Sequence, residues 1–143
     1  MTLQAILLPV FVQVAVTFVL LFTMGGRRLA SLRKGDVRIP DIALGQRVWP
    51  DKVQATSNAF SNQFELPVLF LVLVCLVIMT RKADMLFVVL SWVFVVTRLV
   101  HAGIFIATND VRQRFMAFVI GALVLLIMWA VFALRILAAP LAP

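Results

Sequence analysis

The chain has no tyrosine, and among its 143 residues there are only one cysteine and one histidine. A single cysteine excludes a disulfide within the chain. Structural and catalytic metal sites need several cysteine, histidine or acidic ligands close together, and the sequence offers no such grouping. We therefore expect no metal to be bound.

Charged residues are also scarce. They make up 13% of the chain, against about 25% in a typical soluble domain. Hydrophobic residues make up 64%, and the mean hydropathy is +1.10. A soluble domain of this length could not bury so much apolar surface, so the composition indicates an integral membrane protein whose partners include membrane lipids.

Four apolar runs are each long enough to cross the hydrocarbon core, which takes about 20 helical residues. Because backbone polar groups cannot stay unpaired in lipid, these runs should be helices even where they are rich in valine. Two of the connections are short enough to force antiparallel neighbours. The sequence thus predicts an all-α fold, a single four-span domain over residues 1–143 that forms an up-down four-helix bundle. The expected spans cover residues 3–23, 61–80, 85–107 and 115–134, with a long loop over 25–52.

Basic residues are distributed unevenly over the connections. Seven lie between Arg27 and Lys52, and Arg112 and Arg114 add two more, whereas the opposite side has only three. Loops rich in lysine and arginine stay in the cytoplasm, so both termini are expected to lie on the non-cytoplasmic side. The net charge of +7 then reflects orientation and contact with anionic lipid, and no nucleic-acid partner is needed to explain it.

Polar residues interrupt the second and third spans at matching depths. Asn62 and Glu65 lie three residues apart, on one helical face, and Pro67 should bend the helix beside them. Arg98 and His101 have the same spacing in the antiparallel third span. A charge in the membrane interior costs from about 2.5 to over 10 kcal/mol, so Glu65 and Arg98 should face each other or a shared ligand. The pair could be interhelical glue, or it could line a polar pocket that opens to the cytoplasm.

A longer polar stripe favours the pocket. Phe105, Thr108 and Arg112 continue the His101 face at helical spacing if the helix persists through the following loop, and Asn58 continues the Glu65 face downward. A single salt bridge does not require such a stripe, whereas a hydrophilic anionic ligand would use it.

Three segments carry a family resemblance: N-x-F-E-x-P-V-L-F at 62–70, W-V-F-V-V-T-R-L-V-H-A at 92–102 and N-D-V-R-Q-R at 109–114. Together they resemble the MAPEG superfamily, the membrane-associated proteins in eicosanoid and glutathione metabolism, and in particular its small bacterial members. The resemblance implies a homotrimer of four-helix subunits in the bacterial inner membrane, with glutathione as cosubstrate bound between subunits near the cytoplasmic leaflet. It places glutathione-binding roles on Asn62, Glu65, Arg98, His101, Arg114, Arg27 and Arg28, and the catalytic role of stabilising the thiolate on Arg112.

The sequence departs from the family pattern at identifiable positions. Asn58 stands where the family motif has arginine, and Pro67 follows Glu65 one residue earlier than usual. The absence of tyrosine removes every family tyrosine contact, and Phe105 cannot donate a hydrogen bond.

The resulting hypothesis is a membrane-embedded, glutathione-dependent transferase or peroxidase that acts on lipophilic small molecules bearing an electrophilic centre. The alternative is a non-catalytic scaffold or regulatory protein that keeps the fold, which the missing arginine and tyrosines would favour. A small multidrug exporter is disfavoured, because such transporters place an essential carboxylate in the first span, where this chain has none.

Overall fold

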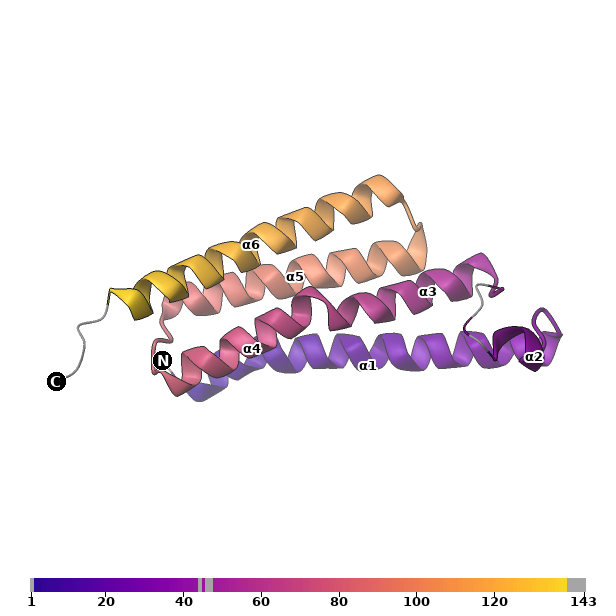
Figure 1. Ribbon diagram of the computed structural model, residues 1–143, viewed down its shortest axis with the longest axis horizontal. Coiled ribbons are helices and arrows are strands. Elements are labelled where there is room, and N and C mark those ends of the chain that lie inside the picture. The colour runs from indigo at the N-terminus through magenta and orange to yellow at the C-terminus, as the bar shows by residue number, and fades with distance from the viewer. Residues whose placement is uncertain (1, 44, 46–47, 139–143) are drawn as a thin grey trace.

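The structure is a computed structural model that describes residues 2–43, 45 and 48–138. The described residues form helices and no strands (Figure 1). Four long rods dominate the molecule, and one of them is made of three consecutive segments. In chain order the elements are α1 (Leu3–Lys34), α2 (Ile39–Ile42), α3 (Asp51–Ser61), η1 (Asn62–Phe64), α4 (Leu66–Met79), α5 (Met85–Ala107) and α6 (Val111–Leu137).

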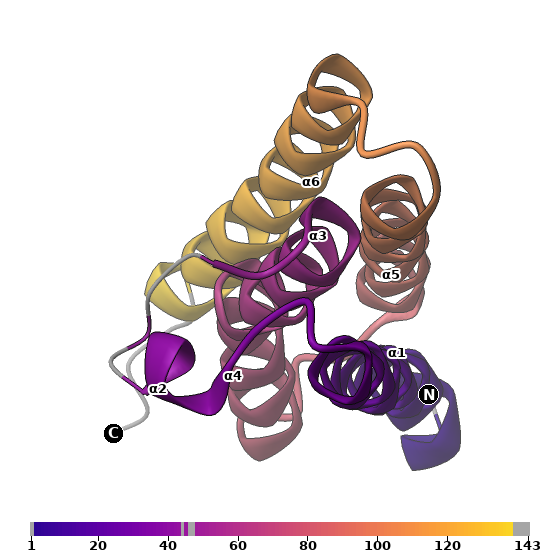
Figure 2. The ribbon, with the colours of Figure 1, turned by 90° about the vertical axis from the view of Figure 1, so that its right-hand side faces the viewer.

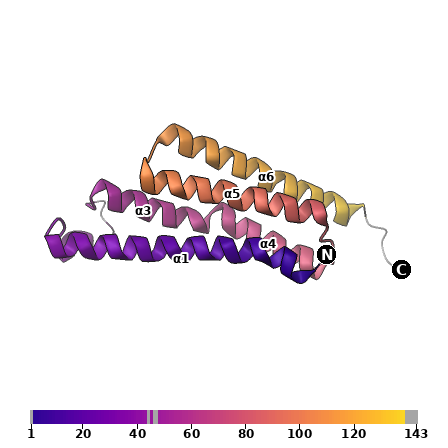
Figure 3. The same ribbon diagram turned by 180° about the vertical axis from the view of Figure 1, so that it is seen from behind.

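The four rods run antiparallel to their neighbours in chain order, as an up-down bundle does (Figures 1 and 3). We call the end that holds residues 35–43 and 108–110 the loop end, and the end that holds residues 80–84 the hairpin end. Helix α5 packs against α6, α1 and α3, and α4 packs against α6. Viewed from the loop end, α2 lies outside the bundle, beside the rod formed by α3 and α4 (Figure 2).

Side chains cap the helices where the chain turns. Asp84 Oδ1 accepts a hydrogen bond from Phe87 N at 2.9 Å, and Asp110 Oδ1 accepts one from Gln113 N at 2.8 Å. Each satisfies a backbone donor that the first turn of a helix leaves unpaired. At the other end of α1, Gly35 adopts the left-handed conformation (φ 76°) that ends many helices.

The core has two parts. The larger cluster, toward the hairpin end, includes the stacked rings of Phe70 and Phe94, whose centroids lie 4.8 Å apart. A smaller cluster toward the loop end is built from Leu20, Ala102 and Phe105 together with the small residues of α3. Most large side chains on the outer surface are apolar, and the four rods are each long and apolar enough to cross a membrane.

The helices extend beyond three of the four expected spans, and α6 covers Val111–Leu137 where 115–134 was expected. Helix α1 continues through Gly25-Gly26 to Lys34, and the second rod begins at Asp51, so the connection shrinks from residues 25–52 to 35–50. Glycine weakens a helix by only about 1 kcal/mol per residue. Packing of α1 on α3, including hydrogen bonds from α1 arginines to α3, offsets that cost.

The expected bend in the second span is confirmed. The helix breaks at η1, and Glu65 has φ −103° and ψ −108°, outside the helical region. Pro67 then lies in the first turn of α4, where a missing N–H costs nothing. The break turns the Glu65 carboxylate to the surface of the subunit, where the side chain is exposed.

Candidate functional site

Arg98 is enclosed by the bundle, with an exposed fraction of 1%. Its Nη2 donates to the Ala117 carbonyl oxygen on α6 at 3.4 Å. The guanidinium carbon lies 5.9 Å from the ring centroid of Phe94 and 5.6 Å from that of Phe118, distances at which an aromatic face attracts a cation. Nε is buried without a hydrogen-bond partner. A buried cation with an unused donor requires an anionic or polar partner.

Gly121 makes room for this arginine. A Cβ at that position would lie 2.7 Å from Thr97 Oγ1, 3.3 Å from Arg98 Nη2 and 3.4 Å from Arg98 Nε. The absence of a side chain on α6 is therefore what allows the guanidinium to lie against the α6 backbone. An isolated glycine within an apolar helical run is the signal that could have revealed this contact from the sequence.

His101 and Arg114 meet at Phe105, one turn closer to the loop end. The His101 and Phe105 rings are edge to face with centroids 5.1 Å apart, and the Arg114 guanidinium carbon lies 4.1 Å from the Phe105 centroid. Arg114 also donates to Asn109 Oδ1. The buried His101 Nδ1 has no partner. Arg98, His101, Phe105, Arg114 and Phe118 thus form one cluster of cations and aromatic rings, which we call the arginine–aromatic cluster.

Glu65 lies near Arg98, and Asn62 lies three residues before Glu65, at the start of η1. The Glu65 carboxylate exerts a Coulombic attraction on Arg98. Among the residues that the structure describes, however, the ion pairs within 4 Å join Arg38 to Asp41 and Arg135 to Asp84, so Glu65 and Arg98 do not form one. Asn62 Nδ2 donates to the Asn58 carbonyl oxygen at 2.8 Å. The two opposite charges are therefore neighbours without being locked together.

Arg27 and Arg28 bind α1 to α3 near the loop end. Arg27 Nη1 donates to the Lys52 carbonyl oxygen at 3.1 Å and also to Thr56. Arg28 Nη2 donates to Ser57 Oγ at 3.0 Å, and its guanidinium lies 5.1 Å from the Trp49 ring centroid.

Arg28 also faces a hollow of about 340 Å³, and its Nε is buried without a partner. Among the described residues that line this hollow none is acidic, and Arg28 gives it a positive charge. We call it the Arg28 hollow. Its walls include Arg28, Trp49, Gln54, Ser57, Asn58 and Ser61.

Arg112 lies away from the arginine–aromatic cluster. Helix α5 ends at Ala107, Asn109 turns the chain with φ 54°, and α6 begins at Val111. The expected continuation of the His101 stripe to Arg112 is therefore wrong, because the helix does not persist through the loop. Arg114, two residues further on, is the α6 arginine that reaches the cluster.

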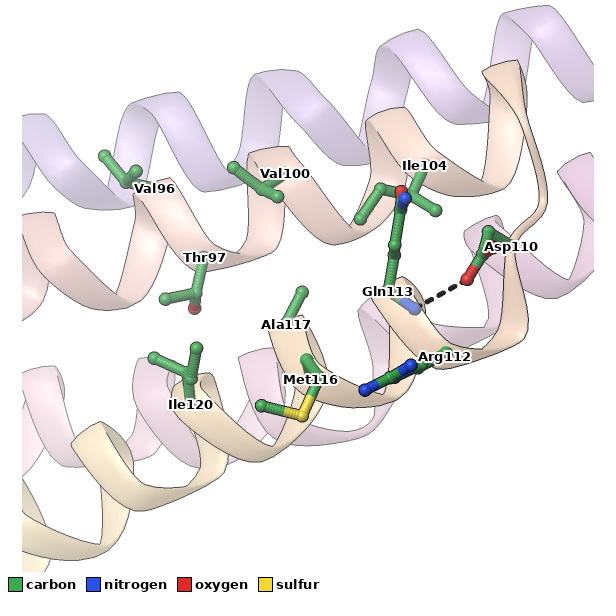
Figure 4. Close-up of a pocket in the computed structure, with 10 residues that line it drawn as sticks. All are labelled: Val96, Thr97, Val100, Ile104, Asp110, Arg112, Gln113, Met116, Ala117 and Ile120. Carbon is green, nitrogen blue, oxygen red and sulfur yellow. Dashed lines mark hydrogen bonds between the residues drawn. The ribbon is translucent and has the colours of Figure 1, made fainter.

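Arg112 lines a groove of about 710 Å³ between α5 and α6 instead (Figure 4). The walls are mainly apolar, and Thr97 and Ile120 point toward one another across the groove. Asp110, Arg112 and Gln113 supply its polar residues at the loop end. We call it the α5–α6 groove. Sequence reasoning missed it, because its shape depends on how α6 is inclined to α5.

The expected site residues thus fall into three places. Arg98, His101 and Arg114 come together, with Glu65 near Arg98. Arg27 and Arg28 lie on the α1–α3 seam, and Arg112 lies in the α5–α6 groove. Asn62 bonds to the backbone of its own rod. Trp49, Ser57, Phe118 and Gly121 were not anticipated from the sequence. Among the described residues, no group of three potential metal ligands occurs.

Four antiparallel rods, each long and apolar enough to cross a membrane, define an integral multi-pass membrane protein. The buried Arg98 places a polar group inside its bundle. The family model described as MAPEG family matches residues 6–134, nearly the whole chain. The chain belongs to the MAPEG family, which confirms the resemblance seen in its motifs. Neither a curated protein nor a solved structure matches it.

Proposed function

We propose that the protein is a glutathione-dependent transferase or peroxidase that acts on lipophilic electrophiles. The observation that carries the proposal is the arginine–aromatic cluster, in which Arg98 and Arg114 flank His101 inside a membrane-spanning bundle with donor atoms left unused. Charged residues are retained at such positions mainly for function.

The available groups fit the charges of glutathione. The tripeptide has two carboxylates and one ammonium group, and the chain offers Arg98 and Arg28, each with an unpartnered Nε, together with the exposed carboxylate of Glu65. In this assignment Arg28 and its hollow receive one carboxylate, Arg98 attracts the other, and Glu65 pairs with the ammonium group. Asn62 and His101 supply further hydrogen bonds.

The chemical role falls to an arginine next to the sulfur. A thiol has an ordinary pKa near 8.5, and only the thiolate is an effective nucleophile. A guanidinium beside the sulfur stabilises the thiolate at neutral pH. The thiolate then forms a carbon–sulfur bond while the bond from that carbon to its leaving group breaks and the leaving group takes the electron pair.

Geometry favours Arg114 over Arg112 for this role. Arg114 lies on the Phe105 ring within the arginine–aromatic cluster, whereas Arg112 is exposed and lines the α5–α6 groove. The apolar groove suits the lipophilic electrophile, which would enter from the bilayer. Arg112 would then contact the polar end of that substrate.

The proposal includes a homotrimer with both termini on the non-cytoplasmic side of a bacterial inner membrane. Asn58, Ser61 and Glu65 are exposed on the second rod of the isolated subunit, and exposed polar side chains on a membrane-spanning rod need a protein partner or a polar ligand. A neighbouring subunit would cover this face and enclose the glutathione site. The loop end carries most of the basic residues and would face the cytoplasm.

Steady-state conjugation of glutathione with an aryl halide in detergent tests the proposal. Arg114→Ala should lower kcat by about 100-fold or more with a smaller change in KM for glutathione, because it removes stabilisation of the reacting sulfur. Arg112→Ala should chiefly raise KM for the lipophilic substrate. Arg33→Ala, which removes an exposed cation outside all three places, is the control and should leave both constants unchanged.

No conjugation or peroxidase activity by the wild type at millimolar glutathione would refute the proposal. A larger loss of kcat in Arg112→Ala than in Arg114→Ala would return the catalytic role to Arg112.

A non-catalytic scaffold is the second candidate, favoured by Asn58 in place of the family arginine and by the lack of any tyrosine. In that case Glu65→Gln with Arg98→Gln should weaken assembly and thermal stability, while glutathione leaves the melting temperature of the wild type unchanged. An increase in that temperature on adding glutathione would exclude the scaffold.

A further inference from the structure

The turn between α4 and α5 contains an arginine in a conformation that usually requires glycine. Arg81 has φ 56°. It follows Thr80, the C-cap of α4. The backbone closes the helix through bonds from Lys82 N to the Val77 oxygen at 3.0 Å and from Arg81 N to the Ile78 oxygen at 3.1 Å. Glycine is the common residue at this left-handed position, because a Cβ is unfavourable there. The conformation of the turn favours glycine, so the reason for an arginine at this position lies in what its side chain contacts.

The charges around Arg81 are not balanced. Asp84, the acid in this turn, is engaged by Arg135, whose Nη2 donates to Asp84 Oδ2 at 2.6 Å. Among the described residues no acidic side chain lies within 4 Å of Arg81, and its side chain is exposed. Lys82 adds a second positive charge. The hairpin end thus presents a free guanidinium where the bundle meets the surface of the membrane.

An apolar hollow begins at the same residue. It has a volume of about 300 Å³ and lies between the start of α1 and the end of α4. Arg81 is the charged residue that lines the hollow. The other lining residues are Leu3, Ile6, Val77, Ile78 and Ala83. An apolar hollow with one cation at its rim complements a molecule that has an anionic head and a hydrocarbon tail.

We propose that the hairpin end binds one anionic phospholipid, with its phosphodiester on Arg81 and an acyl chain between α1 and α4. The side walls belong to membrane-spanning helices, so hydrocarbon chains are the molecules that surround the hollow. The site goes beyond the proposed function, because it lies at the opposite end of the bundle from the arginine–aromatic cluster and the Arg28 hollow.

Thermal unfolding of the full chain in detergent tests the site, with phosphatidylglycerol or phosphatidylethanolamine of the same acyl chains added. Phosphatidylglycerol should raise the melting temperature of the wild type by several degrees more than phosphatidylethanolamine does, and inorganic phosphate should have no effect. Arg81→Gly should abolish this difference. Arg33→Ala, which removes one exposed positive charge at the loop end, should preserve it.

One further variant tests the contact with the acyl chain, and a measurement without lipid tests the role of the turn. Ala83→Phe fills the hollow without changing the charge and should reduce the effect of phosphatidylglycerol. Without lipid, Arg81→Gly should melt no lower than the wild type, because glycine suits the left-handed turn. The proposal is overturned if Arg81→Gly keeps the lipid effect, if both lipids stabilise equally, or if Arg81→Gly is less stable in lipid-free detergent.

Discussion

Replacing Gly121 by alanine should destabilise the bundle, because the new Cβ would lie 2.7 Å from Thr97 Oγ1 and within 3.4 Å of two Arg98 nitrogens. Overpacking a well-filled interior by one methyl group costs about 1–3 kcal/mol. Alanine in place of glycine favours the helix by up to about 1 kcal/mol, so part of the cost is offset. The matched control is Gly103→Ala on α5, where a Cβ meets no atom within 4 Å.

The difference in unfolding free energy between the two variants should therefore be about 1–3 kcal/mol, with Gly121→Ala the less stable. Reversible unfolding by a denaturing detergent in mixed micelles measures it. Adding Thr97→Ala to Gly121→Ala removes the closest atom and should recover part of the loss, with a coupling energy of at least about 0.5 kcal/mol. Thr97→Val keeps an atom in that place and should recover nothing.

Equal stability of the Gly121→Ala and Gly103→Ala variants would refute the placement of Arg98 against α6. The same result from Thr97→Ala and Thr97→Val would contradict the close contact with Thr97, because the clash would then not involve the atom at the hydroxyl position.

Further predictions concern the helix ends and the helix break. The hydrogen bond from Arg135 holds the pKa of the Asp84 carboxyl below its usual range. The stability that this ion pair contributes should therefore be complete above about pH 5 and be lost as the pH falls through the lowered pKa. In unfolding experiments Asp84→Asn should remove this pH dependence of stability and cost up to about 1 kcal/mol. Gln13 Nε2 donates to Gln63 Oε1 at 2.8 Å in the core, so Gln63→Leu should cost about 1–3 kcal/mol. In the same assay the double variant with Gln13→Leu should be more stable than Gln63→Leu alone, and equal stability would mean that the two amides are not coupled.

The sequence was sufficient for the four-helix membrane bundle and for the family, because lipid forces every long apolar run into a helix. Pro67 likewise made the break in the second rod predictable. Helix α1 was expected to stop early, because Gly25-Gly26 is a local signal for a loop. The helix continues because its arginines contact α3, whose residues lie far from them in sequence.

The sequence predicted part of the arrangement of the candidate residues. The spacing of Arg98 and His101 placed them correctly on one face. Whether Arg112 or Arg114 reaches that face depends on the turn at Asn109, and a helical count carried through the turn gave the wrong arginine. The groove beside Arg112 depends on the inclination of α6, which a pattern of apolar residues does not encode.

The most direct measurement of the central claim is the ultraviolet difference absorbance of the glutathione thiolate on the purified protein as a function of pH. If the arginine–aromatic cluster binds glutathione and stabilises its sulfur, the wild type should show thiolate at neutral pH, more than one unit below the ordinary pKa near 8.5. Arg114→Ala should shift the titration back toward that value, and Arg33→Ala should not. A wild-type titration that coincides with that of free glutathione at saturating concentration would contradict the account.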